Sequence, residues 1–309
     1  MLLKVCQSPR LTENLQKIAT TYTKNPKTDD TIIYTPSLTK SADCERLSFS
    51  SAYLLIFHGS RDPRSQAGAD RLAQELSECL GRQETTRWVP DLQAGSNSPM
   101  QAKSVWYPQV GTAALELAPL PLHEQIRLFA NRALTAGCQV LEIVPLFLLP
   151  GVHVMEDIPA EIAQAEASLG GALKIVLCPY LGSHPGWHQL LAARQAAFEA
   201  KAWILLAHGS RRAGSHQGVE QLASQLGAEI AYWSVEPTLA QTVAELAELG
   251  HQQVGILPYF LFAGGITDAI AQQVEQLQQQ FPGVQLYLAQ PLENSCELAQ
   301  LVLDLTQPI

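Results

Sequence analysis

Residues 53–65 read YLLIFHGSRDPRS and residues 203–215 read WILLAHGSRRAGS, so one pattern occurs twice at an offset of 150 residues. In both copies a short apolar run ends in His-Gly-Ser-Arg. A second pair follows in the same order, with VPLFLLPGVHVMED at 144–157 and LPYFLFAGGITD at 257–268. Two such blocks in one order indicate a duplicated domain.

Each copy alternates short, continuously apolar runs with stretches of helical spacing. Strands are predicted at 53–57, 112–117, 139–145 and 173–178, and again at 203–207, 229–233, 253–259 and 284–289. Runs of this kind are typical of parallel sheets covered by helices on both faces. We therefore expect an α/β fold of two tandem doubly wound domains, each with a mainly parallel four-stranded sheet, related by internal duplication.

The repeat also suggests domain boundaries. We expect an N-terminal domain at 51–201 and a C-terminal domain at 202–309, with residues 1–50 as an extension of unknown role outside the repeat. The first copy is longer, and the polar stretch 82–109, broken by Pro and Gly, predicts an inserted loop there. Such a loop is either a lid or binding loop, or a solvated insertion without a role.

Composition excludes several classes of protein. Charged residues make up 16% of the chain and hydrophobic residues 47%, which is too apolar for a disordered chain. The net charge of -9 argues against nucleic acid or an anionic membrane as partner. The densest apolar run, 144–154, is about half as long as a membrane span. Six scattered cysteines without a CxxC pair indicate reduced thiols, so we expect a cytoplasmic protein.

Three residues that could bind a metal follow predicted strands of the first copy. They are His58, Glu116 and His153. Because the carboxyl ends of parallel strands meet at one edge of a sheet, we expect them in one crevice. Two imidazoles and a carboxylate suit a divalent first-row metal such as iron or cobalt, and they also suit proton transfer. Taken singly, each has a simpler interpretation, either a loop contact for a histidine or a surface position for the glutamate.

The Gly-Ser-Arg turns after the two matching strands resemble anion sites. Backbone N–H groups at a helix start, with an arginine beside them, bind carboxylates, although the same residues also serve as a simple turn and helix cap. The predicted ligand-binding residues are Ser60, Arg61, His208, Ser210 and Arg211. The second copy keeps His208 but has Ser234 and Ile266 opposite Glu116 and His153, so one half is expected to be active and the other to support it.

Four motifs carry a family resemblance. They are HGSRDPRS at 58–65, LELAPLPLHEQI at 115–126, VPLFLLPGVHVMEDIP at 144–159 and PYLGSHPGW at 179–187. In this combination the chain resembles the sirohydrochlorin chelatases of the class II chelatase group, in their long two-domain form. The resemblance implies insertion of Fe2+ or Co2+ into sirohydrochlorin, for siroheme or cobalamin biosynthesis, with the metal as a substrate and no permanent cofactor.

The resemblance also assigns roles. The family's two metal-handling histidines correspond to His58 and His153, with Glu116 as a third catalytic candidate. The polycarboxylate sirohydrochlorin is then the partner, and one duplicated chain is expected to work as a monomer. A non-catalytic tetrapyrrole or metal carrier with the same fold is the alternative. A phosphate-ester enzyme would need a P-loop or clustered acidic metal ligands, and the sequence contains neither.

Overall fold

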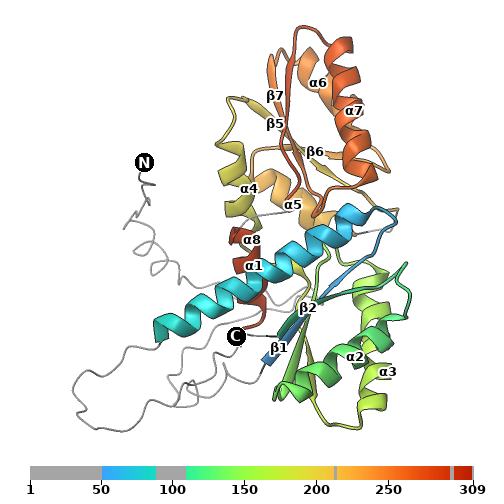
Figure 1. Cartoon of the computed structure of the whole chain (residues 1–309). Helices are drawn as coiled ribbons and strands as arrows, with labels where there is room; N and C mark the ends of the chain where they lie inside the picture. The colour runs from blue at the N-terminus through green and yellow to red at the C-terminus, as the bar shows by residue number, and fades with distance from the viewer. Residues whose placement is uncertain (1–50, 88–108, 212–213, 293–295, 308–309) are drawn as a thin grey trace, which may run out of the picture. The chain divides into compact units, whose positions relative to one another are not determined.

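The computed structural model describes residues 51–87, 109–211, 214–292 and 296–307 (Figure 1). The N-terminal extension predicted at 1–50 and most of the predicted inserted loop lie outside these residues. The described part of the first half forms β1 (Ser51–Phe57), α1 (Pro63–Arg87), β2 (Gln109–Ala114), α2 (Leu122–Thr135), β3 (Val140–Pro145), the π-helical turn η2 (His153–Asp157), α3 (Ile158–Leu169), β4 (Lys174–Leu177), the 3-10 turn η3 (Leu181–Ser183) and α4 (Trp187–Gln195).

The second half repeats this succession. Its elements are β5 (Ala202–Ala207), α5 (Gln217–Gln225), β6 (Glu229–Tyr232), α6 (Leu239–Glu248), β7 (Gln253–Pro258), α7 (Gly265–Gln280), β8 (Gln285–Leu288) and α8 (Cys296–Leu305). The strand orders are β2-β1-β3-β4 and β6-β5-β7-β8, and every neighbouring pair is parallel. The same order in both sheets confirms the predicted duplicated α/β fold with parallel four-stranded sheets.

Strand β1 shows why its sequence folds this way. All seven of its residues are buried. Leu54 and Ile56 face a cluster with residues of α2 and α3, whereas Tyr53, Leu55 and Phe57 face the opposite side. A strand covered on both faces cannot alternate apolar with polar residues, which explains its unbroken apolar run.

One hydrophobic cluster joins the two halves. It contains Leu55 and Val144 from the first sheet together with Trp203 and Leu257 from the second. The last helix of each half reaches the other half, because α4 contacts β7 and α5, while α8 contacts α1 and η3. The rings of Trp187 on α4 and Tyr259 after β7 meet edge to face, 5.4 Å apart between centroids. The two sheets therefore share apolar packing.

Two predicted boundaries differ from the structure. Helix α1 continues to Arg87, so the predicted loop at 82–109 starts later, and Gln109 already belongs to β2. The run from Ser77 to Arg87 contains no proline, and its Glu, Leu, Arg and Gln residues favour a helix despite Gly81. Strand β2 ends at Ala114 rather than at 117, which leaves Glu116 in the loop after it. Among the described residues, no helix has the length and apolar character needed to cross a membrane.

Candidate functional site

Three of the predicted residues come together at the carboxyl ends of the first sheet. His58 directly follows β1, Glu116 follows β2, and His153 begins the π-helical turn after β3. One ligand atom from each lies within 4.8 Å of the other two. His58 and Glu116 are exposed and His153 is half-buried, so a solute can reach the cluster. Two imidazole nitrogens and a carboxylate at this spacing form a donor set for a divalent first-row metal.

Backbone contacts fix the loop of Glu116 against the loop of His58. The Glu116 N–H donates to the His58 carbonyl at 2.9 Å, which continues the pairing of β1 with β2. Gly59 has φ +94, and a Cβ at this position would collide with the Glu116 backbone carbonyl. Only glycine combines this conformation with so close an approach. The glycine of the His-Gly-Ser-Arg pattern thus lets two metal-ligand candidates sit side by side.

A carboxylate orients His153. Its Nδ1 lies 2.7 Å from Asp157 Oδ2. An ionised carboxylate only accepts hydrogen bonds, so Nδ1 carries the proton in this pair and the Nε2 lone pair is free for a metal. The π-helical turn brings the two side chains together, with the Ile158 N–H donating to the His153 carbonyl. π-helical turns inside helices often occur at functional sites.

Aromatic neighbours complete this wall of the site. The rings of His58 and His153 are nearly perpendicular, at 88° and 5.0 Å between centroids. Phe147, in the loop after β3, lies within 6.4 Å of the first ring and 6.2 Å of the second. The Phe147 ring therefore provides an apolar surface beside the two histidines.

The described residues of the second half contain no such cluster. The Ser234 N–H donates to the His208 carbonyl at 2.9 Å, matching the bond between Glu116 and His58, so a serine stands where the carboxylate would be. Burial, and then the neighbouring His58, lower the pKa of His208. That one half is active and the other supports it stays a prediction.

At the position that corresponds to His153, the second half has no metal-binding side chain. The Met155 N–H donates to the Gly151 carbonyl as the Asp268 N–H donates to the Gly264 carbonyl, so the two first helical turns correspond there. Ile266 then takes the place of His153.

The extra residue of the first half lies in the π-helical turn. Ile158 and Ile270 are both fully buried where α3 and α7 pack on their sheets. Seven positions separate Gly151 from Ile158, but only six separate Gly264 from Ile270. The added residue coincides with the turn that presents His153.

Some polar groups of the two predicted anion-binding turns already form hydrogen bonds within the chain. Ser60 Oγ accepts the Asp62 N–H at 3.0 Å, which makes this a tight turn before α1. In the second half the Ser210 N–H donates to His216 Nε2 at 2.8 Å, so a side chain of this chain already takes that amide. Arg61 and Arg211 are exposed, and neither forms an ion pair with another described residue.

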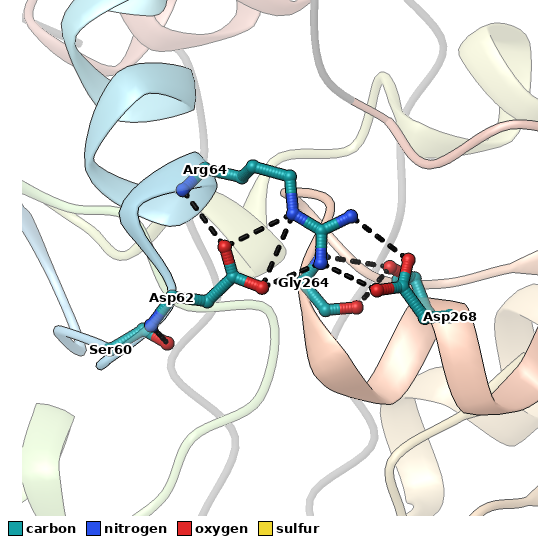
Figure 2. Close-up of polar contacts among 6 residues, drawn as sticks. Ser60, Asp62, Arg64, Gly264 and Asp268 are labelled. Atoms are coloured by element: carbon teal, nitrogen blue, oxygen red, sulfur yellow. Dashed lines mark hydrogen bonds and ion pairs between the residues drawn. The ribbon is translucent and has the colours of Figure 1, made fainter.

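Sequence reasoning missed an ion-pair cluster between the halves. Arg64, at the start of α1, binds Asp62 of its own turn and both carboxylate oxygens of Asp268 on α7, at 2.9 and 2.6 Å (Figure 2). The hydrogen bonds from Arg64 hold the pKa of Asp62 at about 2 and lower that of Asp268. The adjacent opposite charges in Ser-Arg-Asp-Pro-Arg were the available signal, but they do not reveal a partner 204 residues away.

Leu117 is a second missed feature. Among the described residues it is the only non-glycine with positive φ, at 59°, and its side chain is 60% exposed. A bulky side chain in the left-handed region costs about 1–2 kcal/mol, and such outliers concentrate at functional sites.

Comparisons with known proteins point in one direction. The family model described as CbiX matches residues 99–197 and 202–308. A sirohydrochlorin cobaltochelatase of Priestia megaterium is 26% identical over 169 residues, which are 50% of this chain and 55% of the relative. The chain thus spans about half the length of the curated relative it matches.

Solved structures share the fold. SirB from Bacillus subtilis with Fe3+ superposes with a TM-score of 0.62 at 19% identity, over 83% of this chain and 94% of SirB. A CbiX described as the terminal enzyme of siroheme biosynthesis in denitrifying bacteria reaches a TM-score of 0.53 at 21% identity, over 82% and 96% of the two chains. At these identities the likeness concerns the fold alone.

Proposed function

Because the chain belongs to the CbiX family, we propose that it is a sirohydrochlorin chelatase, which inserts Fe2+ or Co2+ into the macrocycle in siroheme or cobalamin biosynthesis in the cytoplasm. The observation that carries the proposal is the convergence of His58, Glu116 and His153 within 4.8 Å. The name of the Priestia megaterium relative supports cobalt, and the Bacillus subtilis structures with Fe3+ and with cobalt support either metal.

The donor set fits the chemistry of insertion. One divalent ion enters the macrocycle while two pyrrole N–H protons leave, so the site must hand over a cation and accept protons. Neutral imidazole does both near pH 7, whereas an ammonium or guanidinium group would repel the metal. Glu116 offsets the charge of the ion. Asp157 binds Nδ1 of His153, so that Nε2, on the other side of the ring, faces away from Asp157.

The remaining predicted residues bind the substrate's carboxylates in this proposal. Ser60 and Arg61 extend from the turn beside His58. His208, Ser210 and Arg211 occupy the matching turn of the second half. An acidic chain that binds a polycarboxylate needs local basic groups, and exposed arginines provide the bidentate fork for them.

The internal duplication supports a monomer with a division of roles. The half at 51–201 supplies the metal-handling residues, and the half at 202–309 supplies an opposing turn without a second metal cluster among its described residues.

The test is metal insertion by the purified chain under anaerobic conditions. Sirohydrochlorin is mixed with Fe2+ or with Co2+, and the absorbance change of the macrocycle is followed with and without protein. We expect an accelerated reaction with at least one metal. His153→Ala should lower the rate at least about 100-fold, with macrocycle binding retained.

His251→Ala is the matched control. His251 lies in the loop before β7, at the opposite end of the strands, and its loss should leave the rate unchanged. Macrocycle binding by the wild-type chain without acceleration would indicate a carrier instead. A fully active His153→Ala variant would refute the assignment of this histidine.

A further inference from the structure

Leu117 combines two unfavourable properties beside the metal-ligand candidates. It directly follows Glu116, its φ is 59°, and its side chain is 60% exposed. A leucine gains nothing for folding from being exposed, and the left-handed conformation opposes folding. The residue is therefore held in this conformation by its surroundings, since the backbone of Glu116 is bonded to His58 and in close contact with Gly59.

The second half contains a natural comparison. Ser234 corresponds to Glu116 because each donates its N–H to the loop histidine's carbonyl, so Val235 corresponds to Leu117. Val235 is not among the described residues with positive φ, and it is half-buried against the shared core, with Cγ2 close to Gly209. The fold thus accommodates an ordinary backbone and an inward side chain at this position. Only the half with the metal cluster turns this side chain outward.

Other exposed apolar side chains lie in the same group of loops. Of the large hydrophobic residues exposed in the described part, Leu117 and Leu120 lie in the loop after β2, and Val152 directly precedes His153 after β3. Leu117 also lines a hollow together with Gly59, Ser60 and Glu116. Exposed apolar side chains on the segments that carry a polar cluster are typical of a surface that binds a ligand with apolar area.

We propose that Leu117 is a substrate-positioning residue whose side chain packs against the flat face of the bound tetrapyrrole. This inference rests on the proposed function and adds to it an apolar contact with the macrocycle. The macrocycle carries carboxylates at its rim and an apolar face at its centre. A side chain next to Glu116 that contacts this face sets the height of the ring nitrogens above the metal ligands.

Three variants at this position test the proposal. Leu117→Gly removes the side chain and tolerates positive φ, Leu117→Asn tolerates it with a polar side chain, and Leu117→Met keeps an apolar one. We expect the first two to raise the KM for sirohydrochlorin about tenfold or more, with a smaller change in kcat and no loss of Tm. Leu117→Met should keep a KM close to that of the wild type.

Val235→Gly is the matched control, because it truncates the corresponding side chain where that chain packs inward. It should lower the Tm, because the side chain that it removes is packed. The inference is overturned if Leu117→Gly and Leu117→Asn keep the wild-type KM, or if Leu117→Gly loses as much Tm as Val235→Gly does. If the wild-type chain neither binds sirohydrochlorin nor metallates it, the proposed function fails first, and this inference fails with it.

Discussion

Arg64 and Asp268 form a bidentate ion pair between the two halves, with N–O distances of 2.9 and 2.6 Å, and Asp62 binds the same guanidinium from its other side (Figure 2). Arg64 belongs to the segment that begins with His58, and Asp268 lies in the first turn of α7, close to Ile266. The pair therefore ties the turn after β1 to the helix that replaces the His153 turn in the second half. All three side chains are partly exposed, so solvent and salt weaken the pair.

Acid should weaken this connection between the halves. Hydrogen bonds from Arg64 hold the pKa of Asp62 at about 2 and lower the pKa of Asp268, both below the ordinary value of 3.8. A carboxyl whose folded pKa is lowered stabilises the fold above about pH 4, and this contribution is lost as the pH falls through the folded pKa. Asp268→Asn should therefore lower the Tm at pH 7 and reduce the fall in Tm between about pH 4 and 2.

The comparison variant for this prediction is Glu245→Gln. Glu245 is an exposed carboxylate on α6 without an ion pair to another described residue. Its Tm curve should follow that of the wild type. A difference between Asp268→Asn and the wild type that stays constant from pH 7 to 2 would contradict the role given to Arg64.

Removing the partner of His153 should impair metal handling while leaving the fold intact. Asp157 Oδ2 lies 2.7 Å from His153 Nδ1, and both side chains are partly exposed. Outer carboxylates that orient a ligating histidine are worth about 10–100-fold in metal affinity or activity. Asp157→Ala should show a loss of this size in Co2+ binding and in insertion rate, with the Tm little changed. Wild-type Co2+ affinity in this variant would show that the pair does not orient the ligand.

Substitution of Gly59 should destabilise the fold for two reasons that can be separated by experiment. Its φ is +94, and an added Cβ would meet the Glu116 backbone carbonyl. Gly137 has φ +86 but open space around it, so Gly137→Ala carries the conformational cost alone. We expect Gly59→Ala to lower the free energy of unfolding by more than the roughly 1–2 kcal/mol of that cost, and to weaken metal binding because Glu116 is displaced. Urea unfolding measures the stability of the two variants, and Co2+ titration measures their metal affinity. Equal losses in Gly59→Ala and Gly137→Ala would contradict the collision of the added Cβ with the Glu116 carbonyl.

Much of this arrangement could be predicted from the sequence. The central strands β1 and β5 are continuously apolar because both of their faces are covered, so their positions and a parallel sheet could be predicted from the sequence. His58, Glu116 and His153 could be grouped for the same reason, since strands that run parallel end at one edge. The exact end of β2 could not be predicted, because the apolar run continues into a loop that is held by its contacts with Gly59.

What escaped prediction depends on contacts between distant segments. The partner of Arg64 lies on α7 and becomes adjacent only when the halves share their core. The conformation of Leu117 is likewise invisible in the sequence, because leucine gives no signal for positive φ. The pairing of His153 with Asp157 at a spacing of four residues was readable as a helical contact, but its function depends on the π-helical turn.

Deleting Met155 should give the first half the same number of residues before its buried isoleucine as the second half has. Met155 is 60% exposed, so its loss removes little packing, and α7 shows that the fold tolerates one residue fewer before the buried isoleucine. Each helical residue contributes about 100° of rotation, so with α3 anchored by Ile158 the preceding turn must rotate and carry His153 away from His58 and Glu116. We expect a folded protein with a Tm near that of the wild type, measured by circular dichroism, and a loss of metal insertion comparable to that of His153→Ala. Met155→Ala keeps the extra residue and should retain activity, so an active deletion variant would show that the π-helical turn does not position His153.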